Sequence, residues 1–380
     1  MTRPRWRLVV PVLALVSAIL VLGLSIGTST AQGTIEPPYD ASYTLTDLGS
    51  ITGLPSPYGG LTFKFDDPNT LLIGGDANDA AGALYSVGVV RDVDNHITGF
   101  SGSAAFFADA AYNDGGVVYG PGNVLFLARW PVNELGQTEA GSAATDKVID
   151  MAALGVSDSL SALNFIPAGF PGAGQLKLTV YDDGNWYTAA YSADGGGTYD
   201  ITSATFELNI GDVGPEGFVF VPPGSPGFAA NSILLSEYGN DVVTAFQLDG
   251  NGDPIPATRQ LFISDLSGAE GAVIDPLTGD FLFSTFGGGD RVIVVQGFAI
   301  PGAPTPTPTP TPTPVPTAQP TATPTPTPTP TPTQAPAGLP PTGSRPGGDG
   351  MAPALWLVLG AGALVLGTPL VARRLARRRR

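Results

Sequence analysis

The chain has no cysteine among its 380 residues. Disulfide bridges and thiol chemistry are therefore excluded, and a domain of this length can build a core large enough to fold without covalent staples. Histidine is nearly absent as well: His96, in the polar stretch "RDVDNHITGF", is the only one. Because there is also no G-x-S-x-G motif, the sequence does not indicate a Ser-His-acid hydrolase, and we assign no catalytic residues.

Basic residues are scarce in the central part of the chain. Residues 32–342 carry 32 acidic side chains against 7 basic ones, which gives a net charge of −25. This charge keeps the domain soluble and excludes nucleic acid and anionic lipid as expected partners of its surface. It favours cations or basic partners instead.

Residues 1–31 have the features of a signal peptide. Three arginines precede the apolar run "LVVPVLALVSAILVLGLSIG". Ser29 and Ala31 are small residues two positions apart, as at a signal-peptide cleavage site. We therefore expect export and cleavage near Ala31. The run is long for a signal peptide, so an uncleaved membrane anchor is the alternative.

Residues 301–338 consist almost entirely of proline and threonine. Alternate prolines remove every second backbone donor, which predicts an extended polyproline II stalk of about 3.1 Å per residue and a reach on the order of 115 Å. Thr/Pro-rich stalks of this kind are typical sites of O-glycosylation.

The end of the chain has three parts in a fixed order: "LPPTG" at 339–343, an uncharged apolar span at 352–372, and the basic tail "RRLARRRR" at 373–380. The span is long enough to cross a bilayer, and the basic tail predicts a cytoplasmic C-terminus with the domain outside. This arrangement resembles a cell-wall sorting signal with its LPXTG motif, here Leu339, Pro340, Pro341, Thr342 and Gly343. The resemblance implies that a sortase cleaves after Thr342 and joins it to peptidoglycan. The alternative is a single-span membrane protein in which LPPTG is not cut.

Residues 34–300 are predicted to be all-β, because short apolar runs alternate with turns rich in Gly, Pro, Asn and Asp. Five related segments begin at Gly59, Gly115, Ser161, Glu216 and Glu270, which are 56, 46, 55 and 54 residues apart. A sheet that repeats at this spacing predicts a β-propeller of five blades. The stretch "YTLTDLGSI" at 43–51 would supply the missing fourth strand of the last blade. Six blades, with a divergent one within 131–160, and a β-sandwich are the alternatives.

The last two segments, "EGFVFVPP…" from Glu216 and "EGAVIDPLTGDFLFSTFGGGDRVIVV" from Glu270, resemble propellers of the NHL and gluconolactonase-like superfamily. The resemblance implies a divalent metal in the channel, held by a glutamate at the start of a blade with Asn and Asp from others. Glu216 and Glu270 match that glutamate, whereas the Asn ligands are not identified; Asn185 and Asn240 are candidates. Oxygen ligands of this kind favour Ca²⁺ or Mg²⁺. Hydrogen bonds from glutamate to backbone amides, with no ligand, are the alternative.

Further acidic and aromatic residues fall where propeller geometry would bring them to one face. The hairpin acids of this group are Asp76, Asp79, Asp182, Asp183, Asp241 and Asp290. The loop "DGNGDP" at 249–254 has the spacing of a calcium loop, but a hairpin turn explains it equally well. The aromatic residues, either a sugar-stacking surface or packing between blades, are Tyr58, Tyr112, Trp130, Trp186, Tyr187 and Tyr238.

Together these features predict a propeller displayed at the cell surface, bound to the wall or the membrane, that acts as a binding or adhesion module for an extracellular ligand. A metal-dependent hydrolase of the lactonase or phosphoesterase type is the second hypothesis, and a structural surface-layer component is the third.

The sorting motif generates a test of wall anchoring. If a sortase uses Thr342, the Thr342→Ala protein loses its covalent link to the wall and is extracted by detergent, whereas the wild-type protein stays with the wall fraction. Immunoblots of the two fractions measure this. Equal resistance of both proteins to extraction would contradict covalent anchoring.

Overall fold

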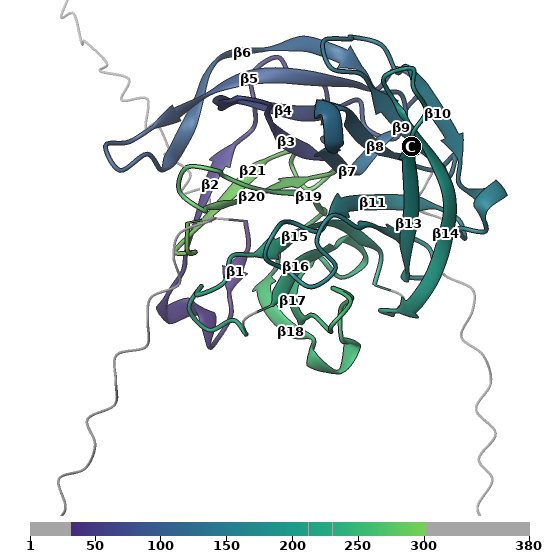
Figure 1. Ribbon diagram of the computed structural model, residues 1–380. Coiled ribbons are helices and arrows are strands. Elements are labelled where there is room, and N and C mark those ends of the chain that lie inside the picture. Colours follow the sequence, from purple (N-terminus) through teal and green to yellow (C-terminus); the bar gives the residue numbers. More distant parts are fainter. Residues whose placement is uncertain (1–31, 212, 230, 301–380) are drawn as a thin grey trace, which may run out of the picture. The chain divides into compact units, whose positions relative to one another are not determined.

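The computed structural model describes residues 32–300 except 212 and 230. They form five antiparallel sheets arranged around one axis, a five-bladed β-propeller (Figure 1). Within this part of the chain no helix is long and apolar enough to cross a membrane. The proposed signal peptide, stalk, sorting motif, membrane span and basic tail lie outside the described residues.

Each blade is a four-stranded meander, and four of the blades are built mainly from consecutive strands. The blades are, in chain order: blade 1, β3 (Leu61–Lys64), β4 (Asp67–Gly75), β5 (Ala83–Arg91) and β6 (Ile97–Asp109); blade 2, β7 (Asn113–Tyr119), β8 (Leu125–Arg129), β9 (Glu134–Thr138) and β10 (Lys147–Asp150); blade 3, β11 (Leu160–Phe165), β12 (Leu176–Val180), β13 (Asn185–Ala193) and β14 (Tyr199–Asn209); blade 4, β15 (Pro215–Val221), β16 (Ser232–Glu237), β17 (Val242–Gln247) and β18 (Gln260–Ser264); blade 5, β19 (Ala269–Ile274), β20 (Phe281–Thr285), β21 (Val292–Gln296) and β2 (Thr44–Gly49).

The prediction of five blades is confirmed, and the six-bladed alternative is wrong. Residues 131–160 hold β9 and β10, which complete blade 2, and then lead through a short 3₁₀ turn (Ala152–Leu154) to β11. Figure 1 shows β3, β7, β11, β15 and β19 meeting around the axis, with β6 and β14 on the outside.

The ring is closed by the N-terminal segment, as the stretch 43–51 predicts. Strand β2 pairs antiparallel with β21, with Thr44 opposite Gln296 and Asp47 opposite Ile293. The Arg291 side chain reinforces this pairing by an ion pair with Asp47 at 2.6 Å. Strand β1 (Thr34–Ile35) adds a fifth strand to blade 4. Residues 32–300 thus contain every strand of the closed ring and form a complete folding unit.

The hydrophobic core lies between neighbouring blades, where both faces of each sheet are buried. One cluster joins blades 4 and 5 through Phe262, Phe281 and Phe283, and another joins blades 2 and 3 through Phe126 and Tyr187. The alternating apolar residues of each strand fill these interfaces, because a single four-stranded sheet could not bury both its faces alone.

Glycines bring the innermost strands together at backbone distance. A Cβ added at Gly60 would stand 2.7 Å from the carbonyl oxygen of Gly115, and one added at Gly271 would stand 2.6 Å from the Cα of Gly60. Likewise, a Cβ at Gly115 would lie 2.8 Å from the amide nitrogen of Gly217, and one at Gly217 would lie 2.5 Å from that of Ala272. No side chain fits at such distances, so only glycine allows this approach. We call Gly60, Gly115, Gly217 and Gly271 the glycine collar.

A clasp of two ion pairs joins the β5–β6 hairpin of blade 1 to the β19–β20 turn of blade 5. The Arg91 guanidinium contacts both carboxylate oxygens of buried Asp275, at 2.5 and 3.1 Å, and His96 Nδ1 lies 2.6 Å from Oδ2 of buried Asp280. The single histidine of the chain therefore links two blades and lies apart from the channel.

The clasp makes part of the stability pH-dependent. The hydrogen bond to Asp280 raises the pKa of His96 above 6.5. The stabilisation from protonated His96 is therefore fully present below pH 6.5 and is lost as the pH rises through the folded-state pKa. We expect His96→Gln to lower the melting temperature by about 2–4 °C at pH 6 and by less at pH 8, since an ion pair whose histidine is partly exposed to solvent contributes about 1 kcal/mol. Thermal melts of residues 32–300 at both pH values measure the difference, and an equal loss at the two would contradict it.

Candidate metal centre

The starts of the five innermost strands place equivalent residues around one end of the channel. In blades 2 to 5 the second strand is extended by one backbone hydrogen bond, from the amides of Trp130, Tyr181, Tyr238 and Phe286 to the carbonyls of residues 112, 159, 214 and 268. The residue two positions after each of these carbonyls is the second residue of the innermost strand of its blade. With its counterpart in blade 1, that position is occupied by Gly59, Asp114, Ser161, Glu216 and Glu270.

Three of these five residues form a compact carboxylate cluster. One oxygen from each of Asp114, Glu216 and Glu270 lies within 4.8 Å of the other two. The residues come from blades 2, 4 and 5, and only 1%, 3% and 1% of their surfaces are exposed. We call them the carboxylate triad. Their proximity follows from the glycine collar, because each triad residue directly precedes a glycine or lies next to one across the axis.

Each triad residue has an oxygen with no hydrogen-bond partner among the described residues. These atoms are Oδ2 of Asp114, Oε2 of Glu216 and Oε1 of Glu270, and the amide oxygen of Asn78 is buried in the same way. Asn78 is held next to the triad because its backbone N–H donates a hydrogen bond to the backbone carbonyl of Asn113 at 2.9 Å. A buried carboxylate oxygen without a donor costs free energy, so the cluster is set up to receive a positive ligand or protons.

Burial and mutual repulsion keep the triad from ionising easily. Burial, the larger cause, raises the pKa of Asp114 to about 7, although hydrogen bonds from the neighbouring acids and Asn78 oppose it. Burial also raises the pKa of Glu216 and that of Glu270 well above the usual value, and the charge of Asp114 adds to both. Without a cation, therefore, all three carboxyls hold protons more tightly than free carboxyls do, and the charge of one affects the titration of the others.

The basic side chains of the domain do not neutralise the triad. Six of the seven basic residues between 32 and 300 form ion pairs with other carboxylates. These pairs are Arg91–Asp275, Arg129–Glu134, Lys147 with Asp194 and Asp200, Lys177–Asp253, Arg259–Glu237 and Arg291–Asp47. Within the described part of the chain no ion pair reaches the triad.

Four aromatic rings form an arc on the same side of the propeller as the triad. Trp130, Tyr181, Tyr238 and Phe286 each directly follow the second strand of blades 2 to 5, one strand further from the axis than the triad. Successive ring centroids are 6.0, 5.9 and 6.0 Å apart, and each pair meets edge to face. All four are half-buried. We call them the aromatic arc.

The structure brings Glu216 and Glu270 together, and it adds Asp114, which the sequence analysis missed. The repeat start predicted at Gly115 is one residue too late, so this prediction does not align "DGG" at 114–116 with "EG" at 216–217. The candidates Asn185 and Asn240 do not reach the triad: their amide groups donate to Asp183 and Glu237 of their own blades, at 2.7 and 2.9 Å. Asn78 takes the place expected for them.

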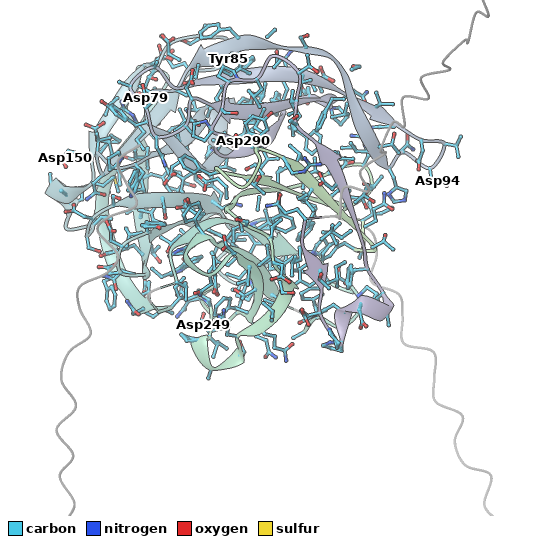
Figure 2. All side chains as sticks on the ribbon, turned by 180° about the vertical axis from the view of Figure 1, so that it is seen from behind. Asp79, Tyr85, Asp94, Asp150, Asp249 and Asp290 are labelled. Atoms are coloured by element: carbon cyan, nitrogen blue, oxygen red, sulfur yellow. The ribbon has the colours of Figure 1, made fainter. Side chains whose placement is uncertain are left out.

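Most of the hairpin acids have local structural roles at turns. Asp79, Asp183 and Asp241 accept hydrogen bonds from the backbone amides of Ala81, Asn185 and Gly268. Asp290, labelled near the middle of Figure 2, accepts those of Tyr58 and Gly287. These contacts explain their presence at the rim without a ligand.

The loop 249–254 is a hairpin turn held by its own aspartates. Asp249, labelled at the margin in Figure 2, accepts the amides of Asn251 and Asp253 at 2.8 and 3.0 Å. Asp253 is buried and binds Lys177 Nζ at 2.6 Å and Trp186 Nε1 at 2.9 Å. Both carboxylates therefore have protein partners, as the turn interpretation expects.

The aromatic candidates divide between the core and the arc. Tyr58, Trp186 and Tyr187 are buried between or within blades. Tyr112 packs under the Arg129 guanidinium, whose carbon lies 5.7 Å from the ring centroid. Only the remaining two, Trp130 and Tyr238, belong to the arc, where they are joined by Tyr181 and Phe286, which the sequence analysis did not select.

Comparisons with known proteins give likenesses of fold only. No protein-family model and no curated protein matches the chain. Similar solved structures include an auxiliary nutrient-binding protein of Bacteroides thetaiotaomicron, at 12% identity over 70% of this chain and 68% of that one, with a TM-score of 0.39. An aldose sugar dehydrogenase of Streptomyces coelicolor is similar at 12% identity over 66% and 83%, with a TM-score of 0.35.

A third similar structure is a protein provisionally assigned as a gluconolactonase, at 10% identity over 70% of this chain and 87% of that one, with a TM-score of 0.36. A fourth similar structure is a protein of Bacteroides thetaiotaomicron that is provisionally assigned as a phosphatase. The chain spans 60% of the length of that protein. These proteins have different functions, so the likeness does not carry one over to this chain.

The triad generates a prediction on stability in the absence of cations. Because the folded-state pKa of Asp114 is about 7 instead of 3.8, and those of both glutamates are raised, the folded protein binds more protons than the unfolded chain, and its stability falls as the pH rises above about 4. We expect Glu216→Gln to raise the melting temperature in EDTA at pH 8 by roughly 2–5 °C, and the gain to disappear near pH 4. Exposed Glu207→Gln, on β14, is the matched control. A variant that melts below the wild type at pH 8 would contradict the repulsion.

Proposed function

We propose that this protein is an exported binding module that holds one divalent cation in the mouth of its propeller channel and binds an extracellular ligand there. The observation that carries the proposal is the set of three buried carboxylate oxygens without donors, contributed by Asp114, Glu216 and Glu270. A divalent cation would satisfy all three at once and offset most of their charge.

The residues present suit Ca²⁺ or Mg²⁺. Both ions take oxygen ligands, and the triad offers three carboxylates, with the amide oxygen of Asn78 beside them. No cysteine exists in the chain, and His96 lies in the clasp between blades 1 and 5, so softer metals have no suitable ligand here. Ca²⁺ uses six to eight oxygens and Mg²⁺ six, so water or a ligand would complete the coordination. The cation would then supply a fixed positive charge for an oxygen-bearing ligand.

Binding is favoured over hydrolysis because the channel lacks a nucleophile–base pair among the described residues. The hydroxyl of Ser161, which holds the equivalent position in blade 3, donates to the carbonyl of Pro215 at 2.6 Å. The aromatic arc instead offers a wall against which a ring or an apolar group of a ligand can pack. Together the triad and the arc suit the recognition of a ligand. The cation would bind a polar group of the ligand, and the aromatic rings would pack against an adjoining flat group.

The last described strand runs to the face of the propeller opposite the triad. Strand β21 runs away from the triad, and Ile300 lies beside Gly279 in the β19–β20 turn, at the opposite end of the channel. The triad and the arc therefore lie on the face opposite the last described residue, Ile300.

The central test is a thermal melt of residues 32–300 in EDTA, followed by addition of Ca²⁺, Mg²⁺, Mn²⁺ or Zn²⁺ at pH 7. A cation at 100 times its Kd stabilises the folded state by about 2.7 kcal/mol, which is a rise of roughly 5 °C for a domain of this size. We expect the rise with Ca²⁺ or Mg²⁺ and its loss in Glu270→Gln. Glu207→Gln, far from the channel, should keep it. The absence of a shift with every cation would overturn the proposal.

The hydrolase hypothesis is decided by the same variants. An enzyme of the lactonase or phosphoesterase type would turn over members of a lactone and phosphoester panel, and Glu216→Gln or Glu270→Gln would abolish the turnover. We expect no cation-dependent turnover by the wild-type protein.

A further inference from the structure

A cavity of ≈ 330 Å³ opens on the axis at the end of the channel opposite the triad. It is lined by the same innermost strands, further along the chain: Val117 and Val118 follow the "DGG" of blade 2, and Ala272 and Ile274 follow the "EG" of blade 5. The glycine collar lies between, because its members precede these residues in β7 and β19. The cavity is thus a separate site, which we call the far pocket.

The walls of the far pocket are mainly apolar and aromatic. Phe65 and Tyr119 flank it with ring centroids 6.1 Å apart, and 46% of the Phe65 surface is exposed. Its volume lies within the range of about 300–1,000 Å³ for small-molecule sites, which are usually lined by apolar side chains with a few polar groups. The exposed Phe65 ring at the mouth of this cavity is available for contact with an apolar ligand.

One charged group at the far pocket has no acidic partner. Lys64, at the end of β3, is the one basic residue of the seven between 32 and 300 that forms no ion pair with a described carboxylate. Two acids stand in the same hairpin. Asp66 forms no ion pair with Lys64 among the described residues, and Asp67, opposite Lys64 in register, accepts hydrogen bonds from the Asn69 backbone amide at 3.1 Å and from Thr70 Oγ1 at 2.8 Å. In a domain with a net charge of −25, Lys64 differs from the other six basic residues in that its ammonium group forms no ion pair with a described carboxylate.

We propose that the far pocket binds a small apolar molecule that carries one carboxylate group. The apolar body fills the space between Phe65, Val118 and Ile274, and the carboxylate pairs with Lys64 at the rim. A single lysine suits a monoanion, because its ammonium group is a compact point charge. The carboxylate pairs with the one base between 32 and 300 that forms no ion pair with a described carboxylate, so charge distinguishes this site from the acidic triad. This site is independent of the proposed cation.

The test is isothermal titration of residues 32–300 with octanoate, below its micelle concentration, and with octan-1-ol, which has the same chain and no charge. We expect octanoate to bind with a stoichiometry of one and about tenfold more tightly than octanol, since one charge-assisted hydrogen bond of about 1.4 kcal/mol corresponds to that ratio. In Lys64→Gln the two affinities should become equal. Lys147→Gln, which removes a lysine from the outer strand β10, should leave the ratio unchanged.

A second variant tests the apolar half of the site. Phe65→Ala should weaken both octanoate and octanol by about tenfold, because it removes the same buried apolar contact from each. Phe206→Ala, which removes a phenylalanine that is 54% exposed on β14, should weaken neither. EDTA and Glu270→Gln should also have no effect, so failure of the cation site and failure of the far pocket are separate results. Both phenylalanines are exposed, and unchanged melting temperatures confirm that the variants are folded.

Three results would overturn the proposal. The first is the absence of saturable binding of octanoate. The second is equal affinity of octanoate in the wild type and in Lys64→Gln. The third is binding to residues 32–300 that disappears when the protein is extended to residue 338, because the pocket would then be covered by the chain's own Pro/Thr-rich segment.

Discussion

The backbone contacts of the glycine collar are the constraint on which the rest of the channel depends. Innermost strands can approach at backbone distance around a narrow axis only if very small residues stand where they touch. Gly60, Gly115, Gly217 and Gly271 satisfy this condition in four blades, and Ala162 stands at the same position in blade 3. The same approach brings the preceding acids within 4.8 Å of one another. Even one methyl group in the collar would push the blades apart and separate the carboxylates. Packing and chemistry are therefore set by the same dipeptides.

The charge distribution along the axis follows from how few bases the domain has. Six of them pair with acids between or at the edges of blades, where they stabilise hairpins and the closing strand. None is left for the triad, so only protons or an added cation can neutralise it. At the other end, Lys64 forms no ion pair with a described carboxylate, and the walls are mainly apolar. The two ends of the channel therefore differ in charge.

The fold could be predicted from the sequence because its signals are local. Turn residues, strand alternation and the repeat spacing identify the five blades, and the pattern of residues 43–51 identifies the closing strand. The site depends on contacts between blades, which repeat spacing does not determine. Glu216 and Glu270 were found through their "EG" pairs, but Asp114 was missed because its unit was aligned one residue late. Tyr181 and Phe286 become recognisable as partners of Trp130 and Tyr238 only when the strand register shows that all four follow the second strand.

The triad breaks the symmetry of the repeat, and this bears on whether its acids are structural. If a carboxylate were needed to begin a blade by accepting backbone hydrogen bonds, all five blades would have one. Blades 1 and 3 have Gly59 and Ser161 at this position and still form complete four-stranded sheets. Moreover, burial and mutual repulsion raise the pKa values of all three acids, so in their charged form they oppose folding. Residues that the fold does not require, and that destabilise it when charged, are best explained by a ligand that compensates them.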